Sequence, residues 1–218
     1  MSGPTPTAGP GARTPGRVVA GVGLRGRRVE LARVAPSHYA ALHGIATAES
    51  SAHLWPLLGR PVPLDEFGSY LAQLAPVQFT MLRRDNGEPV GLVQGIDEDL
   101  RSRRIGLGLV VEPALWSSGW PLEGVVLFLE YLFSGLGFRK VYCHMPTSVL
   151  ERTGGGMDLY LTEEGLHRQH ARVGDAYEDV HVLSIHRDRW DSEMSRRITG
   201  NAVIRSDVVT GDDLGDEG

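Results

Sequence analysis

The sequence predicts an α+β domain with a mixed central sheet of about seven strands flanked by helices. Three observations favour this fold class. Short runs of branched and aromatic residues indicate strands, Gly-containing turns join such runs as hairpins, and a long apolar helix separates two apolar strands. The predicted order is strand, two helices, three strands, helix, strand, weak helix and two strands. Helices and single strands do not alternate throughout, so a doubly wound sheet is not expected.

The N-terminal elements are a strand and two helices. Alternation in VELARV predicts a strand over Val29–Val34. Pro36 and Ser37 favour a helix start, with Ser37 as N-cap, and the helix continues to Ala48. A loop with Trp55 and three prolines follows. A second helix covers Asp65–Ala75, and its apolar face carries Phe67, Tyr70, Leu71 and Leu74.

The central elements are a hairpin, a strand, a helix and a further strand. Asn86-Gly87 lies between VQFTMLRR and EPVGLVQGI, which is a strong hairpin signal. The acidic residues at 97–99 are expected in a solvated loop before the apolar strand Arg104–Val111. The helix Gly119–Leu136 has a broad apolar face that begins at Leu122, and Gly137 suits its C-cap. A short strand over Lys140–Met145 comes next.

The C-terminal elements are a weak helix and a second hairpin. SVLERTGGGM predicts a poor helix, because three glycines interrupt it. LHRQHARV and EDVHVLSIHR flank a turn at Gly174-Asp175, and we expect them to pair. Residues 1–27 are rich in Gly, Pro, Thr and Arg, and residues 195–218 end in an acidic run. Both segments are expected to be disordered tails around one folded domain at 28–194.

Composition excludes several classes of protein. Hydrophobic residues make up 41% of the 218 residues, which is enough for a sizeable core. A net charge of −5 argues against a general nucleic-acid binder, and no apolar run approaches the length of a membrane span. The first residues lack the apolar region of a secretory signal. Cys143 is the single cysteine, so neither an intrachain disulfide nor a cysteine zinc cluster forms. These features favour a cytoplasmic protein.

The turn before the long helix is a candidate anion site. Ser117, Ser118 and Gly119 lead directly into the helix, and a helix start offers unpaired N–H groups with partial positive charge. Small residues let a ligand approach the backbone closely. The same turn also fits the ordinary start of a core helix. Pro121 lacks an N–H, so one potential phosphate donor is missing.

Three motifs resemble the GCN5-related N-acetyltransferases, in particular the ribosomal-protein alanine acetyltransferase group. Trp116-Ser117-Ser118-Gly119-Trp120-Pro121-Leu122-Glu123-Gly124 is similar to their pyrophosphate loop. LGFRKVY resembles the family's passage from helix to fifth strand. EEGLHRQHARVGDAYEDVHVLSIHRDRW resembles the closing hairpin of that group. The resemblance covers about residues 29–190, and the predicted order of elements is the family's order.

The resemblance implies acetyl transfer from acetyl-CoA, the co-substrate, to a primary amine on a small molecule, a peptide N-terminus or a protein. The strand Gly106–Val111 would bind the pantetheine arm through its backbone at Val110 and Val111. Residues 117–120 (Ser117, Ser118, Gly119 and Trp120) would hold the pyrophosphate. The amine would attack in a gap between the fourth and fifth strands. A homodimer stays open as the assembly, and neither nucleic acid nor a membrane is an expected partner.

The sequence also departs from the family pattern. Pro121 and Ser118 replace a small residue and a basic residue of the loop. Pro146 or Thr147 stands where the family has Asn, and Thr153 stands where it often has a Tyr proton donor. No family general acid is therefore carried over. The alternative interpretation is a degenerate member of the family that acts as a binding or scaffold module.

His144 is the candidate catalytic residue. It ends the fifth strand, where the family places its substrate, and an imidazole there can accept the proton of the amine. A solvated histidine at the edge of the core is the alternative. Alternation puts Cys143 on the opposite face, as a buried thiol. The histidines at 167, 170, 181 and 186 are interpreted as surface residues of the hairpin, and no metal is expected.

Overall fold

The computed structural model describes residues 24–190, apart from 53, 117 and 153–160. Within these residues an eight-stranded sheet has the order β1-β2-β3-β4-β5-β6-β8-β7. Every neighbouring pair is antiparallel except β5 and β6, which are parallel. The strands are β1 Leu24–Arg25, β2 Val29–Arg33, β3 Val77–Arg83, β4 Pro89–Asp99, β5 Arg104–Val111, β6 Lys140–Pro146, β7 Thr162–Val173 and β8 Ala176–His186.

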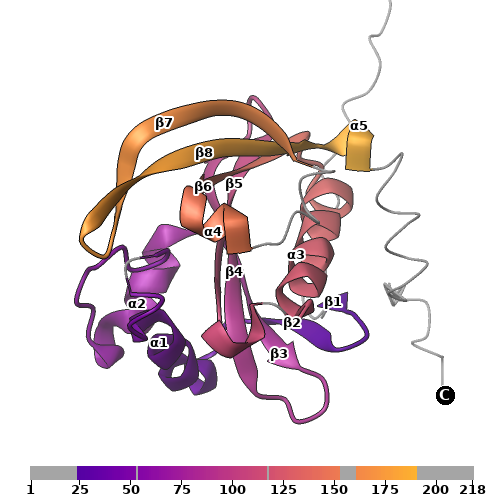
Figure 1. The fold of residues 1–218 in the computed structure, drawn as a ribbon. Helices are drawn as coiled ribbons and strands as arrows, with labels where there is room; N and C mark the ends of the chain where they lie inside the picture. The colour runs from indigo at the N-terminus through magenta and orange to yellow at the C-terminus, as the bar shows by residue number, and fades with distance from the viewer. Residues whose placement is uncertain (1–23, 53, 117, 153–160, 191–218) are drawn as a thin grey trace, which may run out of the picture.

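The helices cover both faces of this sheet, as Figure 1 shows. Their bounds are α1 Tyr39–Thr47, α2 Leu64–Leu74, α3 Trp120–Glu130, α4 Thr147–Arg152 and α5 Arg187–Arg189. Helices α1 and α2 lie on one face, where Leu42, Phe67 and Leu71 pack with Leu92 and Val110. Helix α3 lies on the other face, over a larger cluster that includes buried residues of β1 to β6 and of β8. The expected mixed α+β class is confirmed.

The strands β5 and β6 are paired over only part of their length. Residues 104–106 of β5 pair with residues 140–142 of β6, and the parallel pairing stops there. The strand β5 runs on to Val111 beside β4, whereas β6 runs on to Pro146 beside β8. The two strands therefore diverge, and the sheet opens between them. The expected gap between the fourth and fifth predicted strands is present.

The long hairpin β7–β8 ends in a single buried tryptophan. Trp190 follows β8, is 1% exposed and packs on Phe133, with 5.7 Å between the ring centroids. Its indole Nε1–H donates to Glu130 Oε2 at 2.9 Å. This contact ties the end of the hairpin to the end of α3. It gives a packing reason for the tryptophan that closes the hairpin motif.

Several boundaries differ from the sequence prediction. The sheet starts earlier than the expected domain boundary at 28, because Leu24 is buried and pairs with Leu31. Ser37 is not an N-cap: a 3₁₀ turn begins at Pro36, and the Ala35 N–H is accepted by His38 Nδ1. The acidic residues 97–99 are not a loop but the end of β4, which continues past a bulge to Asp99.

The apolar helix also ends differently. Its α-helical part stops at Glu130, and a π-helical turn covers Tyr131–Gly135. Gly137 follows with φ 73°, as expected of a residue that ends a helix. Leu122 is 42% exposed and does not join the core that the rest of the apolar face forms. Instead, it lines a cavity.

Candidate functional site

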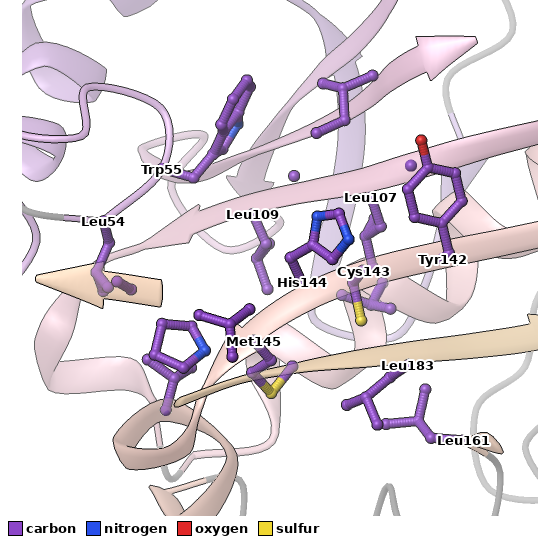
Figure 2. Close-up of a pocket in the computed structure, with 18 of the residues that line it drawn as sticks. Leu54, Trp55, Leu107, Leu109, Tyr142, Cys143, His144, Met145, Leu161 and Leu183 are labelled. Atoms are coloured by element: carbon purple, nitrogen blue, oxygen red, sulfur yellow. The ribbon is translucent and has the colours of Figure 1, made fainter. Parts of the chain in front are cut away.

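A cavity of about 820 Å³ lies where β5 and β6 diverge. Its walls come from the two strands, the start of α3, the loop between α1 and α2, and the β7–β8 hairpin. Figure 2 shows the side chains around it, with Trp55 and His144 on one side of the strands and Cys143 pointing to the other. The cavity therefore connects the α3 face of the sheet with the α1–α2 face.

On the α3 face the cavity wall is apolar. Leu107 and Leu109 of β5 lie opposite Leu183 of β8, and Cys143 of β6 lies between them. Burial raises the pKa of the Cys143 thiol to about 12. At neutral pH the thiol stays protonated, and only a thiolate is a strong nucleophile. Cys143 is therefore an inert part of the wall, as the sequence indicates.

The backbone of β5 presents its hydrogen-bonding groups to the gap at alternate residues. The Glu112 N–H donates to the Val90 carbonyl at 2.9 Å, so Glu112 faces β4. Because backbone groups two residues apart face the same neighbour, Val110 also faces β4. Leu109 and Val111 consequently face the gap. A ligand that lies along this edge meets Leu109 and Val111 rather than Val110.

The turn before α3 is built from its own hydrogen bonds. The Ser118 hydroxyl donates to the Leu115 carbonyl at 2.6 Å and accepts the Trp120 N–H at 3.3 Å. Gly119 is the N-cap, and its φ of 76° lies in the left-handed region that favours glycine. Ser118 therefore shapes the turn with its hydroxyl. Ser117, the fourth member of the expected loop, lies outside the described residues.

Few backbone donors remain at this turn. The N–H groups of Ser118 and Trp120 donate within it, and Pro121, the second residue of α3, has none. Within the described part of the chain, no hydrogen bond joins the N–H of Gly119 or Leu122 to another residue. These two groups point out of a helix start, where the partial positive charge of the helix favours an anion.

Two arginines bring positive charge to the same turn. Arg28 Nη1 donates to the Ser118 carbonyl at 3.1 Å, and its Nε pairs with Glu123 Oε2 at 3.1 Å. The guanidinium groups of Arg28 and Arg83 lie 5.7 and 5.0 Å from the centre of the Trp120 ring. The side chain of Trp120 is thus held by cation–π contacts. Arg28 therefore brings a guanidinium group to the Ser118 side of the turn, where it is also paired with Glu123.

On the α1–α2 face the cavity wall is aromatic. Gly106 and Gly108 leave β5 without side chains there, and Trp55 lies over Gly108. A Cβ at Gly108 would come within 2.4 Å of Trp55 Nε1. That Nε1–H donates to Gln94 Oε1 at 2.7 Å. The position of the indole therefore depends on glycine at 108 and on the buried amide of Gln94.

His144 lies on this face in a small group of titratable side chains. Its ring centroid is 5.8 Å from that of Tyr142 and 6.0 Å from that of His167, and the His170 ring is 4.8 Å beyond His167. Burial, followed by the nearby His167, lowers the pKa of His144 below its usual value, although Asp97 opposes the change. The imidazole is therefore neutral at pH 7 and able to accept a proton.

Two of the predicted site residues, Gly119 and His144, line the cavity, on opposite faces of the sheet. The other described ones do not line it: Val110, Val111, Ser118 and Trp120. Trp55 and Leu109 are missing from the sequence prediction. Strand alternation relative to β4 would have selected Leu109, whereas nothing in the local sequence places Trp55 over β5, because the two are joined only by tertiary packing.

The described residues form a mixed sheet that parts between two parallel strands, next to the start of a helix, and the comparisons identify this arrangement as the fold of an acetyltransferase family. The sequence matches the family described as acetyltransferase (GNAT) domain over residues 28–148. That is more than half of the 218 residues, and the protein belongs to this family. The finer resemblance to the ribosomal-protein alanine group is not part of this match. No curated protein matches the sequence.

Solved structures show the same fold. A probable acetyltransferase (GNAT family) from Chromobacterium violaceum is 23% identical, with a TM-score of 0.66, and the match covers 88% of this chain and all of that one. A chimera of the spermidine N-acetyltransferase SpeG from Vibrio cholerae and hSSAT is 16% identical, with a TM-score of 0.65 and coverage of 76% and 99%. A GCN5-related N-acetyltransferase from Brucella melitensis is 22% identical, with a TM-score of 0.61 and coverage of 78% and 80%. At these identities the similarity is one of fold.

In residues 24–190, without the gaps given above, no group of three or more His, Cys, Asp or Glu side chains is arranged to hold a metal ion. Over the same residues, no helix is both long and apolar enough to cross a bilayer.

Proposed function

We propose that the protein transfers an acetyl group from acetyl-CoA to a primary amine. The observation that carries this proposal is the cavity between β5 and β6, which joins the free donors at the start of α3 to His144 on the opposite face. A thioester that enters from the α3 face and an amine that enters from the α1–α2 face would meet in the gap. Acetyl transfer needs this meeting of two substrates in one geometry.

The donor would bind through three groups of contacts. The pantetheine arm would lie along β5 and bond to the backbone of Leu109 and Val111. The pyrophosphate would accept the N–H groups of Gly119 and Leu122 at the start of α3. Arg28 would add positive charge at the same turn, since its guanidinium contacts the Ser118 carbonyl.

The reaction would use His144 as the base. The neutral imidazole would take a proton from the attacking amine, the new C–N bond would form, and the C–S bond would break. The departing thiolate of CoA would then take one proton from solvent, which balances the proton held by His144. Most of the rate would come from positioning the thioester and the amine against each other.

We place the reaction in the cytoplasm, since a single buried cysteine suits a reducing compartment. We also propose that the predicted C-terminal tail, residues 195–218, and the part of the predicted N-terminal tail before Leu24 are not needed for catalysis. The resemblance of the closing hairpin to the ribosomal-protein alanine acetyltransferases makes a peptide N-terminus one acceptor to include in any assay.

The test is calorimetric titration with acetyl-CoA, followed by thiol release across a panel of primary amines. We expect acetyl-CoA to bind and at least one amine to raise the rate of thiol release above the rate of hydrolysis. Gly108→Ala serves as the matched variant, because its Cβ would come within 2.4 Å of Trp55 Nε1 and displace the indole; it should lower the rate with the amine and leave acetyl-CoA binding unchanged. If the wild-type protein does not bind acetyl-CoA at millimolar concentration, the enzyme proposal is wrong and a binding or scaffold module takes its place.

A further inference from the structure

We infer that the acceptor is a primary monoamine carried on an apolar, aromatic body, and not a polyamine. This inference rests on the proposed function, because it concerns the amine side of the same cavity. It is drawn from the wall of the cavity on the α1–α2 face and from the charges that line it.

The wall opposite β5 is apolar and partly open to solvent. The loop between α1 and α2 contributes Leu54, Trp55 and Leu58 to the cavity, and Leu58 is 58% exposed. An exposed apolar side chain at the rim of a cavity, beside an indole, is a surface that an apolar ligand would cover. Gly106 and Gly108 let the apolar side chains of Ile96 and Trp55 lie directly on the backbone of β5, where a Cβ would come within 2.9 and 2.4 Å of them. The space is therefore suited to a flat, apolar group.

The indole of Trp55 is held in place from behind. Gln94, whose side chain is fully buried at 0% exposure, accepts the Trp55 Nε1–H at 2.7 Å. Its amide Nε2 donates in turn to Gln78 Oε1 at 2.9 Å. This chain fixes which way the Gln94 amide points, since its oxygen faces Trp55 and its nitrogen faces Gln78. Gln94 and Gln78 are polar residues on an otherwise apolar face of the sheet. Their hydrogen bonds are explained if they serve to hold the indole of Trp55 at one angle.

The charges of the lining fit one ammonium group and oppose a second. Among the described residues that line the cavity, Asp97 carries the one carboxylate, whereas Arg152 and Arg172 carry guanidinium groups. Asp97 lies close enough to His144 to oppose the fall in the pKa of the imidazole. A single ammonium would therefore dock at Asp97 beside His144. After it loses one proton to solvent, the neutral amine would attack and give its next proton to His144. The second ammonium of a polyamine would leave water without a carboxylate partner, which is costly.

The experiment compares three amines with the wild-type protein and acetyl-CoA: 2-phenylethylamine, ethylamine and spermidine. We expect kcat/KM for 2-phenylethylamine to exceed that for each of the others at least tenfold. Trp55→Ala should remove this preference, and Trp55→Phe should keep part of it, because a smaller ring remains. Leu100→Ala is the matched control, since Leu100 is 71% exposed at the β4–β5 turn and does not line the cavity.

Several outcomes would overturn the inference while the proposed function stands. Spermidine or a peptide with an N-terminal alanine as the best acceptor would do so, and so would a preference for 2-phenylethylamine that survives in Trp55→Ala. If no amine is acetylated, calorimetry with 2-phenylethylamine decides the matter. Binding to the wild type and Leu100→Ala but not to Trp55→Ala supports the inference, and no binding to the wild type refutes it. Failure of the proposed function appears separately, as absence of acetyl-CoA binding.

Discussion

Replacement of Pro121 by alanine tests whether a phosphate binds at the start of α3. Pro121 is the second residue of the helix, is buried and lines the cavity. Alanine at this position would present an N–H beside those of Gly119 and Leu122, at the positive end of the helix. If the pyrophosphate lies there, the variant should bind acetyl-CoA more tightly than the wild type does.

The size of the effect follows from one hydrogen bond. A bond to a charged group contributes about 1.5–3 kcal/mol, and an open site such as this one reduces it to roughly 1 kcal/mol. That corresponds to an approximately fivefold lower Kd. Stability should move in the opposite direction. Loss of the proline restraint on the unfolded chain costs about 0.4–1 kcal/mol, and loss of two buried methylenes costs about 0.8 kcal/mol each. A total near 2 kcal/mol lowers Tm by roughly 4–8 °C in a protein of this size.

Both quantities can be measured on one purified protein, by titration calorimetry and by thermal unfolding. Pro113→Ala is the matched control: it also restores an N–H, but at the far end of the loop, in the 3₁₀ turn Pro113–Leu115. Tighter binding in Pro121→Ala alone supports the phosphate position. Equal affinity in both variants and the wild type would show that the phosphate does not use the second helical residue, and the reasoning about this turn would be refuted.

Three other perturbations test the base, the anchor of α3 and a surface network. His144→Ala should lower kcat about 10²-fold or more with unchanged affinity for acetyl-CoA. In the wild type, kcat/KM should fall on the acidic side only below pH 6.5, because burial lowers the pKa of His144. Unchanged turnover in the variant would mean that His144 only packs against its neighbours. Glu123→Ala should cost about 2–4 kcal/mol of unfolding free energy, since the backbone N–H groups of Arg28 and Val29 would lose their acceptor, and chemical denaturation measures this loss. The Glu164 carboxylate has a pKa lowered from 4.5 to about 2, first by the hydrogen bond from Lys140 and then by that from Ser184. Its contribution to stability is therefore present above pH 4.5 and lost as the pH falls towards 2. Denaturation curves should show that the free energy of unfolding decreases less over this pH range in Glu164→Gln than in the wild type.

Local sequence signals predicted most of the fold because they report backbone geometry directly. Asn86-Gly87 gives the hairpin its turn, and Gly87 has φ 74° there. Gly137 ends the apolar helix in the same left-handed region. The divergence of β5 and β6 was predicted only through the family resemblance. The sequence of one strand does not determine where it pairs with another.

The parts that the sequence missed depend on distant partners. Leu24 looks like part of a polar tail, yet it is buried against Leu31 and the core beneath α3. Ser37 has the residue type of a helix cap, but His38 takes that place because its ring also reaches Thr80 on β3 at 2.9 Å. Trp55 lines the cavity because Gln94, which lies 39 residues away along the chain, accepts a hydrogen bond from its indole. Such contacts override local propensity because they bury more surface.

Only three residue pairs join β5 to β6, so the sheet consists of two parts with a short connection. One part is β1 to β5, and the other is β6 with the β7–β8 hairpin. Where this pairing has ended, the amides of Leu109 and Val111 face the gap and not a neighbouring strand. They should therefore exchange with deuterium sooner than amides in the paired strands do. A pantetheine arm that bonds to these amides would take the place of a neighbouring strand along this part of β5. It would also hold the two parts of the sheet at one angle. Acyl-CoA would then be a structural member of the sheet as well as a reactant, and resistance to unfolding would rise with its concentration.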